Sequence, residues 1–202
     1  MRVCSAVGAA VGLALLAGSA SAADIAPVRR YEAAPYVPAP VRTSFISEVR
    51  IGASAHELEG PEKGTWNING EVLFARPFTT ADLFTSYFVP RPHVGASINV
   101  NGMTSFLYAG LSWTVDIGPA FFVEASLGGA VHNGNTQLNL ALVPSDRNAL
   151  GCSPLFRESA SVGYRFTPSW SIMATIEHLS NAGICAQNRG LTNVGVRLGY
   201  TF

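Results

Sequence analysis

The chain has 202 residues, of which 13% are charged and 10% aromatic, and it contains 20 glycines. Its 13 basic and 13 acidic residues balance, so the composition shows no basic footprint for nucleic acid. The mean hydropathy is slightly positive, which is unusual for a soluble domain. After the amino-terminal segment, however, no apolar run is long enough for a transmembrane helix. Such a chain could cross a membrane only with strands, whose alternation hides hydrophobicity from a window average.

The first 42 residues indicate export. Residues 1–22 combine Arg2, an apolar run over 7–17 and the small-residue ending Ser19-Ala20-Ser21-Ala22, which is typical of a secretory signal peptide. The alternative, a membrane anchor, needs about 20 apolar residues without that ending. Residues 23–42 are rich in proline, which removes backbone donors and disfavours a paired strand. We interpret this segment as a periplasmic leader.

Residues 43–202 are predicted to form one all-β domain, an eight-stranded antiparallel transmembrane β-barrel. Apolar and polar residues alternate with a period of two along eight segments, as strands with one apolar face require. Eight is the smallest common strand number for such barrels. The expected strands are 45–56, 66–74, 94–100, 105–117, 121–128, 156–166, 170–180 and 191–202.

The polar face of these strands is expected to line the lumen. It carries charges of both signs, which can pair inside a narrow barrel, with small residues that leave them room. The inverse arrangement, an apolar lumen with charges outside, would be a lipocalin-like ligand carrier. Aromatic residues near strand ends favour the membrane version, and the closing strand ends on Phe202, which resembles the signal that the barrel assembly machinery reads in bacterial outer-membrane proteins. The expected lumen charges are Glu48, Arg50, Glu71, Asp116, Glu124, Arg157, Arg165, Glu177 and Arg197.

Strand counting places the connections 1-2, 3-4, 5-6 and 7-8 outside the cell, with long loops there and short turns such as 167–169 on the inner side. The longest loop spans about 132–154. Cys152 and Cys185 fall in two outer loops, whereas Cys4 lies in the signal peptide. In an oxidising compartment this predicts a Cys152–Cys185 disulfide. A metal site is the weaker interpretation, because the Cys and His residues lack ligand spacing.

The candidate chemistry lies at the outer end of the seventh strand. His178 and Ser180 are two residues apart, so both point outward, toward lipid. Histidine and serine are the base and nucleophile of acyl-transfer enzymes. The simpler alternative is two polar residues at the membrane–water boundary.

A longer motif favours the enzyme. The run His178-Leu179-Ser180-Asn181-Ala182-Gly183-Ile184, the later Asn188-Arg189-Gly190-Leu191 and the ending Gly199-Tyr200-Thr201-Phe202 resemble the outer-membrane lipid A 3-O-deacylase (PagL) family. The resemblance implies a barrel over about 43–202 that hydrolyses the ester-linked acyl chain at the 3-position of lipid A, without metal or cofactor. Ser180 would be the nucleophile, His178 the general base, and Asn181 and Gly183 part of the oxyanion and substrate site. The implied partner is lipopolysaccharide in the bacterial outer membrane, and the resemblance leaves a homodimer open.

One position departs from the family pattern. Thr192 stands where the family has a glutamate that completes the triad. If Phe166 faces Trp170 across the inner turn, Glu158 lies opposite His178 on the same face. We therefore hypothesise that Glu158 supplies the acid, against the alternative that it is exposed to headgroups at the loop edge. The second function class is a non-catalytic structural or adhesive barrel with a decayed triad.

Overall fold

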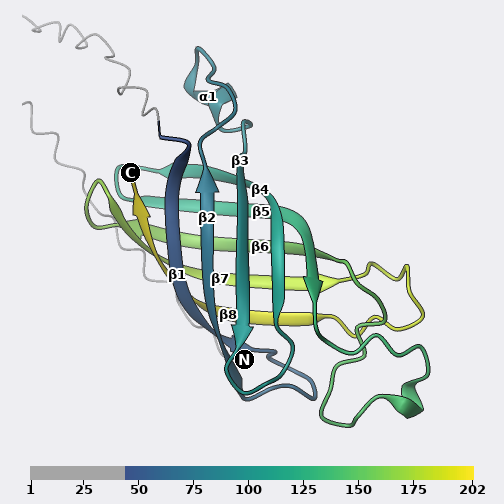
Figure 1. Cartoon of the computed structure of the whole chain (residues 1–202). Coiled ribbons are helices and arrows are strands. Elements are labelled where there is room, and N and C mark those ends of the chain that lie inside the picture. Colours follow the sequence, from purple (N-terminus) through teal and green to yellow (C-terminus); the bar gives the residue numbers. More distant parts are fainter. Residues whose placement is uncertain (1–43) are drawn as a thin grey trace, which may run out of the picture. The chain divides into compact units, whose positions relative to one another are not determined.

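The computed structural model describes residues 44–202, which form a closed barrel of eight antiparallel strands in sequence order, with β1 paired to β8 (Figure 1). The predicted fold class is confirmed. The predicted signal peptide and periplasmic leader lie outside the described residues. None of the helices within 44–202 is both long and apolar enough to cross a membrane. The strands are β1 (Ile46–His56), β2 (Thr65–Phe74), β3 (Arg91–Asn99), β4 (Phe106–Ile117), β5 (Phe121–His132), β6 (Leu155–Arg165), β7 (Trp170–Ser180) and β8 (Leu191–Thr201).

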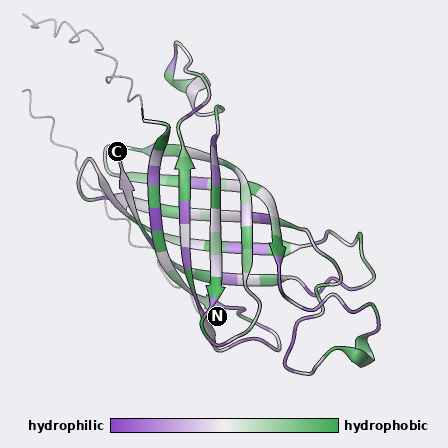
Figure 2. Cartoon of the chain, in the orientation of Figure 1, coloured by the Kyte–Doolittle hydropathy of each residue, from purple (hydrophilic) through white to green (hydrophobic). Residues whose placement is uncertain are grey.

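The period-two pattern of the sequence sets which side chains enter the lumen. On β7 the odd positions from Ser171 to Leu179 are buried, whereas Trp170, Ile172, Ala174 and Ile176 are exposed on the outer surface. Figure 2 shows the same alternation of hydrophobic and hydrophilic residues on the other strands. Because successive side chains point to opposite faces of a sheet, the apolar residues form a continuous outer belt.

The two ends of the barrel differ in their connections. At one end, here called the loop end, lie the β1–β2, β3–β4, β5–β6 and β7–β8 connections, including the longest, 133–154, which contains the 3-10 turn η1 (Leu140–Leu142). At the other, the terminal end, β1 begins and β8 ends (Figure 1). The β4–β5 and β6–β7 turns there span only 118–120 and 166–169.

The expectation of short turns throughout the terminal end is wrong for one connection. Residues 75–90, between β2 and β3, form a long segment that contains the short helix α1 (Leu83–Ser86). It projects at the terminal end in Figure 1. The alternation of β2 stops at Phe74, and the prolines at 77, 90 and 92 punctuate the stretch that follows, which fits an irregular connection.

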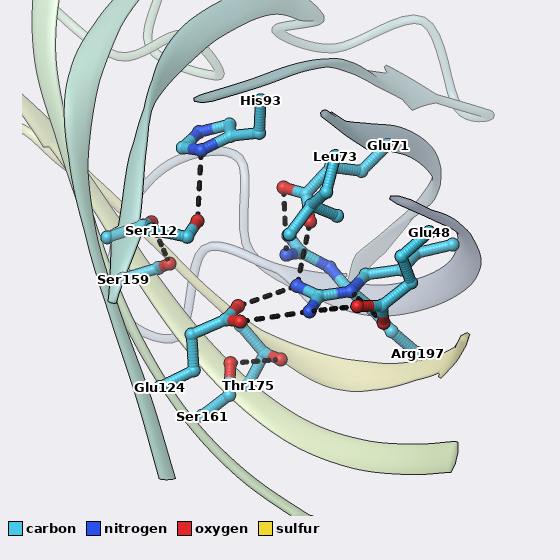
Figure 3. Close-up of polar contacts among 12 residues, drawn as sticks. Glu48, Glu71, Leu73, His93, Ser112, Glu124, Ser159, Ser161, Thr175 and Arg197 are labelled. Atoms are coloured by element: carbon cyan, nitrogen blue, oxygen red, sulfur yellow. Dashed lines mark hydrogen bonds and ion pairs between the residues drawn. The ribbon is translucent and has the colours of Figure 1, made fainter. Parts of the chain in front are cut away.

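The middle of the lumen is filled by paired charges, as predicted. Arg50 donates to Glu48, Glu71 and Glu124 (Figure 3). Arg157 and Arg197 both contact Glu177. The pairing satisfies charges that would be costly if buried alone. Two further predicted lumen charges, Asp116 and Arg165, have the inward parity of β4 and β6 but lie at the terminal mouth, where they pair at 2.7 Å with partly exposed side chains.

Toward the loop end the lumen contains buried polar side chains, such as His56 and Glu62, and a cluster of buried apolar side chains. The apolar cluster includes the inward neighbours of the candidate site on β7 and β8. Its packing makes the end of these strands a rigid platform. The members are Phe106, Tyr108, Ala130, Leu150, Leu155, Leu179 and Leu191.

Candidate active site

His178 and Ser180 lie on the outer surface of β7, at its loop end, as the sequence predicts. Both side chains are half-buried, whereas the even-numbered residues before them are exposed. Leu179 between them is fully buried in the apolar cluster. Two residues along a strand separate the Cα atoms by roughly 6.5–7 Å, so both side chains share one patch of the outer face. Within residues 44–202 the Ser180 hydroxyl has no hydrogen-bond partner.

Thr192 is the direct partner of His178 across the β7–β8 ladder. The Thr192 Oγ1 and His178 Nδ1 atoms are 2.8 Å apart, which is a hydrogen bond. A proton on Nδ1 lets the ring donate to the hydroxyl and leaves Nε2 with a free lone pair. The position that departs from the family pattern therefore still holds the imidazole, although it brings no charge.

Gly190 packs against the other edge of the same ring. A Cβ at this position would lie 2.9 Å from His178 Cε1 and 3.3 Å from Nε2. Its backbone has a φ of +73°, a conformation that glycine adopts without steric cost. Sequence reasoning missed this contact, because it depends on how the β7–β8 loop returns toward the ring.

Glu158 lies opposite His178 on the β6 side, so the register derived from the 166–170 turn is confirmed. Its side chain is exposed on the outer face. The hydrogen bond at Nδ1 goes to Thr192 rather than to Glu158, and no residue from 44 to 202 forms an ion pair with this carboxylate. The structure thus brings His178 between a hydroxyl on β8 and a carboxylate position on β6.

Asn181 organises the loop that follows Ser180. Its amide nitrogen donates to the carbonyl oxygens of Leu150 and Gln187, at 2.9 and 2.6 Å, and its Oδ1 accepts from the Gly183 N–H at 2.9 Å. In this conformation both amide hydrogens are engaged, so an oxyanion role for Asn181 would need these bonds to exchange when substrate binds. The roles of Asn181 and Gly183 in an oxyanion site stay predictions.

The β5–β6 and β7–β8 loops are joined beside the site. Cys152 and Cys185 form the predicted disulfide, with their Cα atoms 6.2 Å apart. The Arg189 N–H donates to the Ala149 carbonyl oxygen at 3.1 Å. A Cβ on Gly151 would overlap the Gln187 carbonyl oxygen. The two loops therefore approach as closely as their backbones permit.

Glu62 ties together the β1–β2, β3–β4 and β5–β6 loops. Its carboxylate, fully buried, accepts hydrogen bonds from the Thr104 N–H and hydroxyl and from the Asn148 N–H, and it pairs with His56 at 2.9 Å. Burial raises the pKa of Glu62, but the bonds from His56, Asn148 and Thr104 outweigh it and hold the pKa at about 2. The acid therefore stays ionised, as a buried carboxylate with several donors does.

A cavity of about 270 Å³ opens next to Thr192. One wall comes from the segment after β1, where the Leu58 N–H donates to the Thr192 carbonyl oxygen at 3.1 Å. The other comes from the residues that enter β8. Its lining combines charged side chains with apolar ones and includes Thr192, the partner of His178. It is lined by Glu57, Leu58, Glu59, Arg189, Gly190, Leu191 and Thr192.

A second histidine–serine pair lies inside the lumen. The Ser112 hydroxyl is 3.0 Å from His93 Nδ1 (Figure 3). Both residues are buried, so a lipid substrate has no route to them. Among residues 44–202, the His, Cys, Asp and Glu side chains form no group of three or more that could hold a metal ion. The outer-face pair is the one accessible to substrate.

Comparison with known structures gives the same architecture. The crystal structure of the outer-membrane enzyme PagL superposes with a TM-score of 0.59 at 16% identity, covering 77% of this chain and all of that one. The amino-terminal β-barrel domain of Pseudomonas aeruginosa OprF matches with a TM-score of 0.51 at 12% identity, covering 79% of this chain and 98% of that domain. A designed transmembrane β-barrel matches with a TM-score of 0.51 at 14% identity, covering 80% and 98%.

Sequence comparison supplies the family. No curated protein sequence matches the chain significantly. The family model described as lipid A 3-O-deacylase (PagL) matches residues 66–201, a span that begins in β2 and includes His178, Ser180 and Thr192. Together with the outer-membrane barrel fold this places the protein in the bacterial outer membrane, and the chain belongs to the PagL lipid A 3-O-deacylase family.

Proposed function

We propose that this protein removes the ester-linked acyl chain at the 3-position of lipid A, with Ser180 as the nucleophile and His178 as the general base. The observation that carries the proposal is the orientation of the His178 ring. Thr192 bonds its Nδ1 at 2.8 Å, which leaves Nε2 for the serine on the same face. Membership of the PagL family supports the same activity.

The reaction has two halves, acylation and deacylation of Ser180, and each requires two proton transfers at His178. Nε2 takes the Ser180 hydroxyl proton as Oγ attacks the ester carbon, and the tetrahedral intermediate collapses with return of that proton to the sugar 3-oxygen. Water then attacks the acyl-serine, loses a proton to Nε2 and releases the fatty acid as Ser180 regains its proton. No side chain is consumed and no redox change occurs.

We assign different parts of the acid's usual task to Thr192 and Glu158. The Thr192 hydroxyl holds the orientation of the ring. Glu158, directly opposite His178 on β6, offsets the imidazolium charge across a Cβ–Cβ distance of about 4.5–5.5 Å. At a lipid boundary such a charge interaction is stronger than in water. This role would account for the presence of the Glu158 carboxylate beside the membrane, where an unpaired charge costs free energy.

The location of the pair suits a lipid substrate. Exposed apolar side chains cover the outer face of β7 below His178, where acyl chains would lie, and the cavity beside Thr192 contains Arg189 and two carboxylates. An ester linking a chain to a sugar would sit between these regions. In the orientation expected from the sequence, the loop end faces the outer leaflet.

The alternative is a barrel that no longer catalyses, favoured by one observation: Thr192 brings no negative charge to Nδ1. Mass spectrometry of lipid A from a host that expresses the protein separates the two functions. Wild type should release one 3-linked acyl chain, and Ser180→Ala and His178→Asn should not. Ser169→Ala, at the opposite end of β7, is the matched control. Unchanged lipid A with all four proteins would favour the non-catalytic barrel, provided that heat-modifiable gel mobility shows each protein to be folded.

A further inference from the structure

The segment 75–90, here called the aromatic loop, exposes large apolar side chains at the terminal end of the barrel. Phe78, Leu83, Phe84 and Phe88 are each between 60% and 73% exposed, and α1 within the segment buries none of its residues. Neighbouring connections at this end are three- and four-residue turns. A contiguous apolar surface of this kind marks an interaction site.

The aromatic loop has a defined shape. Asp82 caps α1 by accepting from the Thr85 N–H at 2.8 Å, and the Ser86 hydroxyl donates to the Leu83 carbonyl oxygen. The rings of Phe84 and Phe88 meet edge to face with centroids 5.2 Å apart. These local bonds present the apolar side chains without support from a protein core.

The end of the loop is attached at two places. Val89 is buried and its carbonyl oxygen accepts a hydrogen bond from Arg76 Nε at 3.1 Å, and the second contact is to the lipid-facing surface. Trp113 Nε1 on β4 donates to the Phe88 carbonyl oxygen at 3.2 Å. Trp113 has the outward parity of β4, because its neighbours Ser112 and Thr114 are buried and Val115 is exposed. The apolar surface of the loop is thereby continuous with the apolar belt of the barrel.

We propose that the aromatic loop docks into the phospholipid leaflet at the terminal end, with Leu83 and Phe84 at the boundary between headgroups and acyl chains. Aromatic side chains favour this zone, and an amphipathic turn binds there by burying apolar area. Since the barrel is rigid, an anchor at this end also sets the depth of His178 and Ser180 at the other end.

Site-directed fluorescence tests the docking without using enzymatic activity, so its outcome is independent of the proposed function. Single cysteines are introduced into the full chain carrying Cys4→Ser, with the Cys152–Cys185 disulfide intact, and labelled with an environment-sensitive dye. Phe84→Cys is the test position, Val162→Cys on the outer face of β6 is the lipid control, and Ser145→Cys in the β5–β6 loop is the water control. The protein is reconstituted into phosphatidylethanolamine–phosphatidylglycerol vesicles.

At position 84 we expect quenching by acyl-chain spin-labelled lipid comparable to position 162. Iodide present on both sides of the bilayer should quench the dye several-fold less than at position 145. Iodide quenching equal to that at position 145 would overturn the proposal. Protection in native outer membranes but not in these vesicles would also overturn it, and would point to a protein partner instead.

Discussion

Thr192 Oγ1 lies 2.8 Å from His178 Nδ1, at the position where the family resemblance places a glutamate. A hydroxyl can hold the ring in place, but it brings no negative charge to offset the imidazolium. The enzyme should therefore be active but slow, because orientation is only part of what the third member of a triad supplies.

Substitutions at Thr192 should move the rate in both directions. Thr192→Val removes the hydrogen bond and should lower kcat/KM roughly 2- to 10-fold. Thr192→Glu should raise kcat about tenfold or more, since a hydrogen bond to a charged group contributes about 1.5–3 kcal/mol. Thr192→Gln supplies length without charge and is the control. If Thr192→Glu were no faster than Thr192→Gln, the rate would not be limited by the missing negative charge beside His178 Nδ1.

Loss of the Glu158 carboxylate should lower kcat more in the wild type than in a Thr192→Glu background. Glu158→Gln is expected to lower kcat about tenfold in the wild type, through loss of the charge opposite His178. In the Thr192→Glu background the same change should cost less, because a second carboxylate already offsets the imidazolium. A double-mutant cycle on kcat measures this coupling. Full activity of the single Glu158→Gln variant would exclude the carboxylate from catalysis.

Gly190 and Gly64 form a matched pair of loop-end glycines. Both have positive φ, +73° and +80°, but a Cβ at Gly190 would meet the His178 ring at 2.9 Å, whereas a Cβ at Gly64 meets nothing within 4 Å. Gly190→Ala should therefore displace the imidazole and lower kcat about 10- to 100-fold, as small misplacements of a catalytic group do. Gly64→Ala shares the backbone strain and should lower kcat much less. Equal losses would show that strain, not the ring contact, is responsible.

The strands and their register could be predicted from the sequence, whereas the contacts of the loops, apart from the Cys152–Cys185 disulfide, could not. The period-two pattern and the short turn before Trp170 were sufficient to place Glu158 opposite His178. The contacts of Asn181 show why most loop contacts could not be predicted. Its partners Leu150 and Gln187 lie on two irregular loops, and no periodicity relates their backbones to it. The aromatic loop was not predicted for the same reason, because its sequence interrupts the strand pattern and has no periodic pattern of its own.

The Cys152–Cys185 disulfide should hold the site loops rather than the barrel. A Cys152→Ala, Cys185→Ala variant lacks this constraint between two loops. A disulfide typically contributes about 2–4 kcal/mol to the free energy of unfolding. The β-ladder does not depend on it, so heat-modifiable mobility should persist. Limited proteolysis within 133–154 should become faster, and kcat should fall because Asn181 loses its fixed neighbours. Cleavage at the wild-type rate would show that backbone contacts such as Arg189 to Ala149 suffice.

Acid should loosen the loop end through Glu62. Its pKa of about 2 in the folded protein lies below the ordinary value of 4.5, so the folded state binds a proton less readily than the unfolded state. The stabilisation from Glu62 is therefore complete above about pH 5 and is lost as the pH falls from 4.5 through 2. Amide hydrogen exchange of Thr104 and Asn148, corrected for intrinsic pH effects, should report this loss, because both N–H groups donate to the Glu62 carboxylate. In Glu62→Gln the protection should be lower at neutral pH and no longer depend on pH in that window. Protection that still falls between pH 4.5 and 2 in Glu62→Gln would show that Glu62 is not the group responsible.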